Sequence, residues 1–149
     1  MTRSSPVLLA AALALGLAAC HSGRGGTDLP GDPDDKQPFA RIAEDDLVHF
    51  TGTEPFWGGQ VSEGVLTYQT PEDTKGQSVE VARFAGRAGV SFTGTLEGQD
   101  FALMVTDGEC SDGMSDRTYP FTATLKVRGE TRGGCAWTET QPFTGPQAP

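Results

Sequence analysis

The stretch FTATLKV, residues 121–127, alternates apolar and polar side chains from end to end. Its apolar positions are Phe121, Ala123, Leu125 and Val127, and its polar positions are Thr122, Thr124 and Lys126, followed by Arg128. Successive side chains of a β-strand point to opposite faces of the sheet, so the alternation places all four apolar residues on one face. It predicts an antiparallel strand with one face on a core and the other in water.

Seven other short runs of strand-like composition accompany this stretch. They are LVHF (47–50), FWGGQV (56–61), VLTYQT (65–70), VEVARF (79–84), VSFTGTL (90–96), FALMVT (101–106) and GGCAW (133–137), with turn signals at Glu63-Gly64, Gly86-Arg87, Glu97-Gly98 and Gly129-Glu130. Only ARIAEDDL, residues 40–47, suits a helical turn or two. Eight evenly spaced strands predict an all-β antiparallel meander closed as a barrel, because closure removes exposed edges. A two-sheet sandwich is the alternative.

Three cysteines, Cys20, Cys110 and Cys135, constrain this domain. Cys20 stands at the end of the N-terminal apolar run, so two cysteines remain for the domain. An isolated pair of cysteines in an oxidising compartment predicts a disulfide, here Cys110–Cys135. Chain entropy assigns such a bond a stabilisation of about 3 kcal/mol. A metal site on the two cysteines is the alternative, but His49 is the only histidine in the folded part and no second ligand stands at metal-binding spacing. The sequence therefore predicts no metal and no cofactor.

Acidic and hydroxyl residues are dense in GECSDGMSDR, residues 108–117. Counted from Asp107, the order of acids and glycine does not fit an EF-hand, because Asp112 takes the sixth place, where that loop needs glycine. Asp112 and Asp116 instead suit turns in which the side chain bonds the backbone. A calcium site of another kind remains the alternative. Hydrolysis by paired carboxylates needs one buried acid, and these acids stand among Gly, Ser and Thr, so no catalytic residue is predicted.

The stretch GTEPFW, residues 52–57, allows two interpretations. In one, Glu54 is an acid beside an aromatic pocket that binds a ligand or a basic side chain of a partner. In the other, which we favour, Phe56 or Trp57 plugs one end of the barrel and Glu54 pairs with Arg117 or Arg132. The candidate ligand- or partner-binding residues are Glu54, Phe56, Trp57, Asp112, Asp116, Arg117 and Tyr119.

Three blocks carry a resemblance to a known group of proteins. GTEPFW (52–57), CSDGMSDRTYPFTATL (110–125) and GGCAW (133–137) resemble the blocks shared by a family of uncharacterised bacterial lipoproteins. The resemblance covers the domain from about Val48 to Trp137 and implies no particular activity. In layout the chain is also similar to the membrane-bound inhibitors of c-type lysozyme, which are lipid-anchored and disulfide-bonded.

The first nineteen residues have the layout of a secretory signal: Arg3, then an apolar run over residues 7–19. That run is shorter than the ~20 residues that a membrane-spanning helix needs. LAAC, residues 17–20, resembles the lipobox of bacterial lipoproteins, which implies removal of residues 1–19 and lipidation of Cys20. His21 replaces the aspartate that retains such proteins at the inner membrane, so the resemblance implies an outer-membrane lipoprotein facing the periplasm.

Composition divides the remaining chain into three parts. Residues 20–38 are rich in Gly, Pro and Asp and poor in apolar residues, which predicts a lipidated flexible tether. Residues 39–140 form the predicted all-β domain, and residues 141–149 are predicted to be a disordered tail.

The formal net charge of −9 makes nucleic acid a poor partner and a basic protein a better one. No catalytic motif is present, so we expect a non-enzymatic binding or structural protein of the bacterial envelope. The alternatives are an inhibitor of a basic hydrolase such as c-type lysozyme, and a protein that binds a metal or a small ligand.

Overall fold

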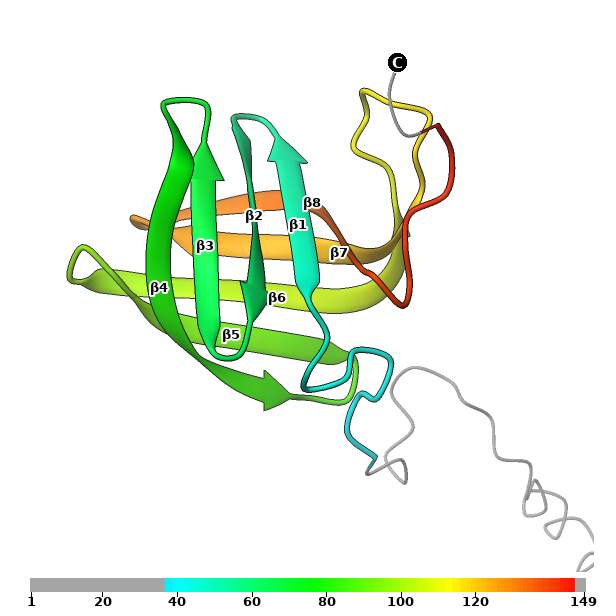
Figure 1. Cartoon of the computed structure of the whole chain (residues 1–149), viewed down its shortest axis with the longest axis horizontal. Helices are drawn as coiled ribbons and strands as arrows, with labels where there is room; N and C mark the ends of the chain where they lie inside the picture. Colours follow the sequence, from blue (N-terminus) through cyan, green and yellow to red (C-terminus); the bar gives the residue numbers. More distant parts are fainter. Residues whose placement is uncertain (1–36, 147–149) are drawn as a thin grey trace, which may run out of the picture. The chain divides into compact units, whose positions relative to one another are not determined.

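The computed structural model describes residues 37–146, which form one closed antiparallel barrel of eight strands (Figure 1). The strands are β1 (Val48–Thr53), β2 (Phe56–Ser62), β3 (Val65–Thr70), β4 (Asp73–Ala85), β5 (Gly89–Leu96), β6 (Gln99–Cys110), β7 (Tyr119–Val127) and β8 (Glu130–Thr138). Each strand pairs with the next, and β8 pairs with β1 to close the sheet. The predicted meander barrel is confirmed, and the sandwich alternative is wrong.

Strand alternation fills the inside of the barrel as predicted. The apolar residues of β7 are all buried, and those of the other strands join them in one core that includes Phe50, Phe101 and Phe121. The small residue Ala136 of β8 is paired with Phe50 on one side and Phe121 on the other. An eight-stranded barrel is just wide enough for its own side chains, so a small residue between two large ones lets both rings fit.

Three of the hairpin turns have two residues each, with positive φ at both: Glu63-Gly64, Glu97-Gly98 and Arg128-Gly129. Such turns match the right-handed twist of the flanking strands. The third lies one residue earlier than the predicted Gly129-Glu130. Glu130 instead opens β8, where it pairs with Val127.

Residues 40–47 are not helical, which corrects the expectation of a helical turn there. Within the segment one reverse turn is closed by the Asp46 carboxylate, which accepts from the Ala43 amide at 2.8 Å. The segment also bonds to strand ends: the Phe39 amide donates to the Gly86 carbonyl at 2.7 Å, and Arg83 donates to the Ile42 carbonyl at 2.7 Å. Ile42 is 1% exposed, and Phe39 packs on the core ring of Phe121. Residues 39–46 therefore close one end of the barrel (Figure 1, cyan).

The folded domain extends beyond residue 140, so residues 141–146 do not belong to a disordered tail. Gln141 hydrogen-bonds Arg41, and Thr144 forms a two-way backbone bridge with Thr118. The ring of Phe143 packs on Trp137. The predicted signal sequence, Cys20, the tether up to residue 36 and the last three residues lie outside the described residues.

Candidate functional site

The two ends of the barrel differ. Residues 39–46 cover one end and leave a hollow of about 280 Å³ there, whereas the end that carries the β1–β2, β3–β4, β5–β6 and β7–β8 turns holds a larger hollow of about 630 Å³, here called the mouth. Figure 1 shows the β1–β2 and β3–β4 turns together at the top, away from the cyan segment. Ten residues line the mouth: Pro55, Phe56, Tyr68, Thr70, Pro71, Glu72, Asp73, Gln77, Arg128 and Arg132.

Arg132 is the most enclosed cation of the mouth, with its side chain 17% exposed. Its position on β8 has the inward parity of the core residue Ala136. The guanidinium donates from Nε and Nη2 to Glu130 at 3.1 and 2.6 Å, and from Nη1 to the phenol oxygen of Tyr68 at 3.0 Å. Arg132 is therefore held in place by two neighbours while it borders the mouth.

Tyr68 contributes a second polar group beside Arg132. Its ring is 2% exposed and packs edge-on against Phe101 at 5.9 Å. Because the phenol oxygen accepts a hydrogen bond from Arg132, the hydroxyl proton remains available to an acceptor.

Charged residues also surround the rim. Arg128 donates to Glu97 at 3.0 Å, and the hydrogen bond lowers the pKa of that carboxyl below its usual value. Gln77 bonds both of them. On the β3–β4 turn Glu72 is exposed, and one carboxylate oxygen of Asp73 accepts from the Gly76 amide at 3.0 Å.

Trp57 lies inside the barrel at 4% exposure, tilted against Phe50 at 5.8 Å between ring centres. A Cβ at Gly52 would come within 2.1 Å of its indole, and one at Gly134 within 2.8 Å, so both glycines are required to make room for the ring. Trp57 thus fills the interior, in agreement with the plug interpretation, while Phe56 is 52% exposed on the rim. Glu54 is exposed rather than paired with Arg132.

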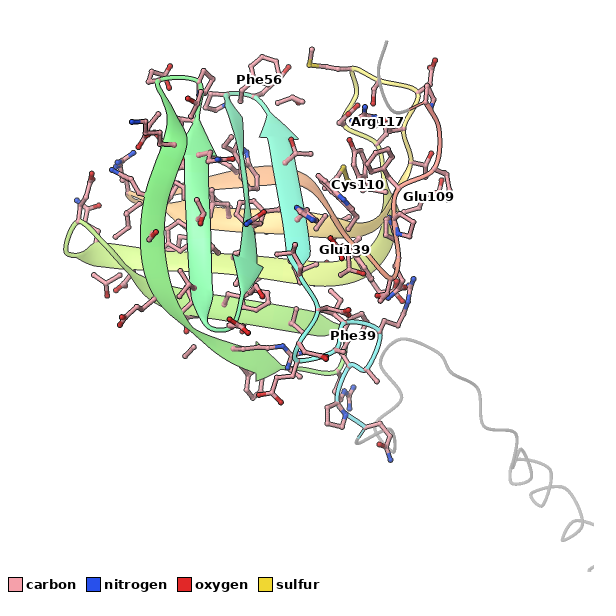
Figure 2. All side chains as sticks on the ribbon, in the orientation of Figure 1. Phe39, Phe56, Glu109, Cys110, Arg117 and Glu139 are labelled. Carbon is pink, nitrogen blue, oxygen red and sulfur yellow. A yellow bond between two sulfur atoms is a disulfide. The ribbon has the colours of Figure 1, made fainter. Side chains whose placement is uncertain are left out.

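A different region gathers most of the other predicted residues. A disulfide joins Cys110 to Cys135, with their Cα atoms 5.6 Å apart, as predicted. Cys135 faces outward from β8, because the next residue, Ala136, belongs to the core. The bond therefore fastens residues 111–118, here called the pinned loop, to the outside of the barrel. Figure 2 labels Cys110 and Arg117 in this region, and Phe56 at the top of the barrel.

Asp112 organises the pinned loop. One carboxylate oxygen accepts from the amides of Met114 and Ser115 at 2.9 and 2.8 Å, and the other from the hydroxyls of Ser115 and Tyr119 at 2.7 and 3.2 Å. The two backbone amides are the main reason that its pKa is lowered to about 2. This geometry supports the predicted turn role of Asp112; Asp116 is exposed.

Four aromatic residues form an outer cluster on this side of the barrel: His49, Tyr119, Trp137 and Phe143. The rings of His49 and Trp137 stack with centres 5.1 Å apart, and Tyr119 packs on Trp137 and Phe143 at 5.4 Å from each. Arg117 lies over the Phe143 ring at 4.6 Å and donates to the Pro146 carbonyl at 2.9 Å. Burial raises the pKa of Tyr119.

The predicted site residues are therefore divided. GTEPFW and the pinned loop touch, because the Thr53 hydroxyl donates to the Asp112 carbonyl at 3.3 Å. Of the seven predicted residues, however, only Phe56 lines the mouth. Sequence reasoning did not place Tyr68 or Arg132 there. The available signal was strand parity, which puts an arginine on the inward face of β8.

Within residues 37–146 no group of three or more His, Cys, Asp or Glu side chains could hold a metal ion. That part of the chain also has no helix with the length and apolar character required to span a membrane. No family model, curated protein or solved structure matches the chain.

Proposed function

We propose that the protein is a lipid-anchored protein of the bacterial envelope that binds a small ligand in the barrel mouth without transforming it. The observation that carries this proposal is the contrast between the ends: one is covered by residues 39–46, and the other holds a hollow of about 630 Å³. Mouths of β-barrels are common ligand sites, typically with a few polar groups on an otherwise apolar wall.

The groups that border the mouth suit recognition. A guanidinium keeps its proton in proteins and presents fixed donors, and Arg132 is already positioned by Tyr68 and Glu130. Groups held in place before binding reduce the ordering cost of association. Phe56 adds an exposed aromatic face at the rim.

The path of the chain also suits an anchored receptor. The described chain begins at residue 37, next to the end of the barrel that residues 39–46 cover. A lipid on Cys20 would therefore be connected to the barrel through residue 37, at the covered end. In this proposal the protein resides at the outer membrane and faces the periplasm.

Ligand binding can be followed with the two tryptophans. In a Trp137→Phe variant Trp57 is the only indole. It lies inside the barrel, one residue from Phe56 of the mouth. We expect soluble disaccharide-peptides of the cell wall to change its fluorescence saturably, and mass spectrometry to recover them unchanged. Chemical conversion of the fragments would contradict the proposal. So would the absence of a fluorescence change, or a change that Arg132→Gln leaves intact.

Anchoring requires its own test. Cys20→Ser should leave the protein soluble or uncleaved, while the wild type fractionates with outer membranes. Ser22→Ala, two residues along, is the matched control and should fractionate as the wild type does. Recovery of Cys20→Ser in the outer membrane at the wild-type level would contradict lipidation.

An inhibitor of a basic hydrolase is a second candidate, because the pinned loop is held by the hydrogen bonds to Asp112 and presents Met114, which is 69% exposed. Pre-ordered loops bind partners at low entropic cost, and a net charge of −9 favours a basic partner. Inhibition of c-type lysozyme that Met114→Ala relieves and Arg132→Gln leaves unchanged would select this candidate over the mouth.

A further inference from the structure

We infer that the ligand of the mouth is a small zwitterion, a molecule with both a free carboxylate and a free amine, such as an amino acid or a short peptide. This inference rests on the proposed function and identifies its ligand class. The mouth joins an enclosed arginine to carboxylates on the opposite turn, with an aromatic ring on the rim.

The carboxylate of the ligand fits Arg132 and Tyr68. A guanidinium has five N–H donors, and three bond Glu130 and Tyr68, so two have no partner among the described residues. The Tyr68 hydroxyl adds a third donor. Arginine binds carboxylates through paired, charge-assisted hydrogen bonds, which strengthen when they are shielded from water.

Glu130 does not block this site. Its side chain is 63% exposed, whereas that of Arg132 is 17% exposed. Ion pairs with a solvent-exposed carboxylate contribute little to stability, so Glu130 can move into water when another carboxylate arrives. A ligand carboxylate inside the mouth would replace it on the more enclosed side of the guanidinium.

The amine of the ligand fits the β3–β4 turn. Glu72 is exposed there, and Asp73 uses one carboxylate oxygen for the Gly76 amide, which leaves its other oxygen without a partner in the described part of the chain. Both residues line the same hollow as Arg132. An ammonium group has three donors that such oxygens can accept.

Charge favours a zwitterion over a simple ion. A free anion would be repelled by a protein with a formal net charge of −9, and a free cation would be repelled by the guanidinium of Arg132. A zwitterion has no net charge and can pair with both Arg132 and the carboxylates of the β3–β4 turn. Phe56, which is 52% exposed and lines the hollow at its rim, gives an apolar contact for a side chain of the ligand.

The test uses alanyl-alanine as the probe, with the full chain carrying Trp137→Phe. Four forms are titrated: free, N-acetylated, C-amidated and blocked at both ends. We expect saturable binding of the free form and at least tenfold weaker binding of each singly blocked form. Arg132→Gln should weaken the free and N-acetylated forms but not the C-amidated form, which already lacks the carboxylate.

Variants of the amine end give the reciprocal pattern. Glu72→Gln with Asp73→Asn should weaken the free and C-amidated forms and leave the N-acetylated form unchanged. Lys126→Gln, on the outer face of β7, is the control and should change none of them. A thermal melt of each variant verifies that it is folded.

The outcomes separate this inference from the proposed function. If the doubly blocked peptide binds as tightly as the free one, the mouth binds ligands but the zwitterion inference is wrong. If no form binds while cell-wall fragments do, and Glu72→Gln with Asp73→Asn leaves the binding of those fragments unchanged, the inference is again wrong and the proposed function stands. If Arg132→Gln changes neither kind of binding, both are overturned.

Discussion

The barrel interior and the outer cluster are two hydrophobic assemblies that the same chain stabilises by different means. Inside, Phe50 and Phe121 are at most 1% exposed, enclosed by the strands and, for Phe121, also by Phe39 of the covering segment. Outside, Trp137 lies on one face of the wall, is only partly buried and is covered by Phe143 and by Tyr119, the residue that follows the pinned loop. The outer face of a barrel has no second sheet to pack on it. The segments that cover Trp137 are therefore attached to the barrel by a disulfide and by hydrogen bonds.

The difference explains where the polar bonds of this domain gather. In the core, closure of the barrel satisfies the backbone, and the buried side chains are almost all apolar. In the pinned loop, Asp112 alone accepts four hydrogen bonds and Cys110 is bonded to β8. The core depends on apolar area, and the outer cluster on ties that hold its cover in place.

The largest expected effect is at the core. Phe121→Ala removes a fully buried ring and should lower the free energy of unfolding by about 3–5 kcal/mol, because the cavity it leaves cannot be refilled by its neighbours. Urea denaturation of the full chain measures this. A loss smaller than that caused by removing the disulfide would reverse the ranking of the two regions.

Removal of the disulfide ranks second. Cys110→Ser with Cys135→Ser should lower the free energy of unfolding by about 2–4 kcal/mol, since a bond across 25 residues of sequence restricts the unfolded chain. Hydrogen exchange should increase most in the pinned loop and at Tyr119, and least in β5. Uniform exchange throughout the barrel would show that the bond does not act on the cover specifically.

Phe143→Ala should have a smaller effect, about 1 kcal/mol, as expected for a side chain that is only partly buried. The expected result is a modest fall in melting temperature with exposure of Trp137, seen as a red shift of fluorescence in a Trp57→Phe background. An unshifted spectrum would mean that Phe143 does not shield Trp137 in solution.

Asp112→Asn should have the smallest effect at neutral pH, because an amide oxygen can still accept from the amides of Met114 and Ser115. Its signature is pH dependence. The folded pKa of about 2 lies below the unfolded value of about 3.9, so Asp112 stabilises the fold above about pH 4 and loses this contribution as the pH falls toward 2.

Melting curves between pH 2 and 6 should therefore fall less steeply for Asp112→Asn than for the wild type. Parallel curves would contradict the role of the ionised carboxylate. Calcium added at pH 7 should not raise the melting temperature, whereas a rise that Asp112→Asn removes would restore the calcium alternative, because a ligand of the folded state stabilises it.

Much of this fold could be predicted from short stretches of sequence. FTATLKV has the inward and outward faces that its alternation predicts, and Glu63-Gly64 and Glu97-Gly98 form turns where expected. The domain extends past residue 140, the boundary that the sequence predicts. Residues 141–146 contain little apolar surface, and their order comes from contacts with Arg41, Thr118 and Trp137, which are distant in sequence.

The candidate site was harder to predict, for a physical reason. Strand alternation predicts that the Cys135 side chain lies on the outer face of β8. It does not predict the contact between Trp137 and Phe143, because that contact requires the C-terminal segment to turn back along the barrel. Phe56 and Trp57 are adjacent in sequence and point to opposite sides of β2, so one lies on the rim and the other in the core. Composition alone cannot assign them.

The amino-acid sequence by itself determined the strands, most of their turns and the cysteine pair, because these depend on side-chain alternation and on residues close together in the chain. Only the tertiary structure decided which end of the barrel is open and what lines it. Tyr68 and Arg132 are 64 residues apart, and they meet because β8 closes on β1 in one particular register. That register is a property of the whole sheet, so no local pattern contains it.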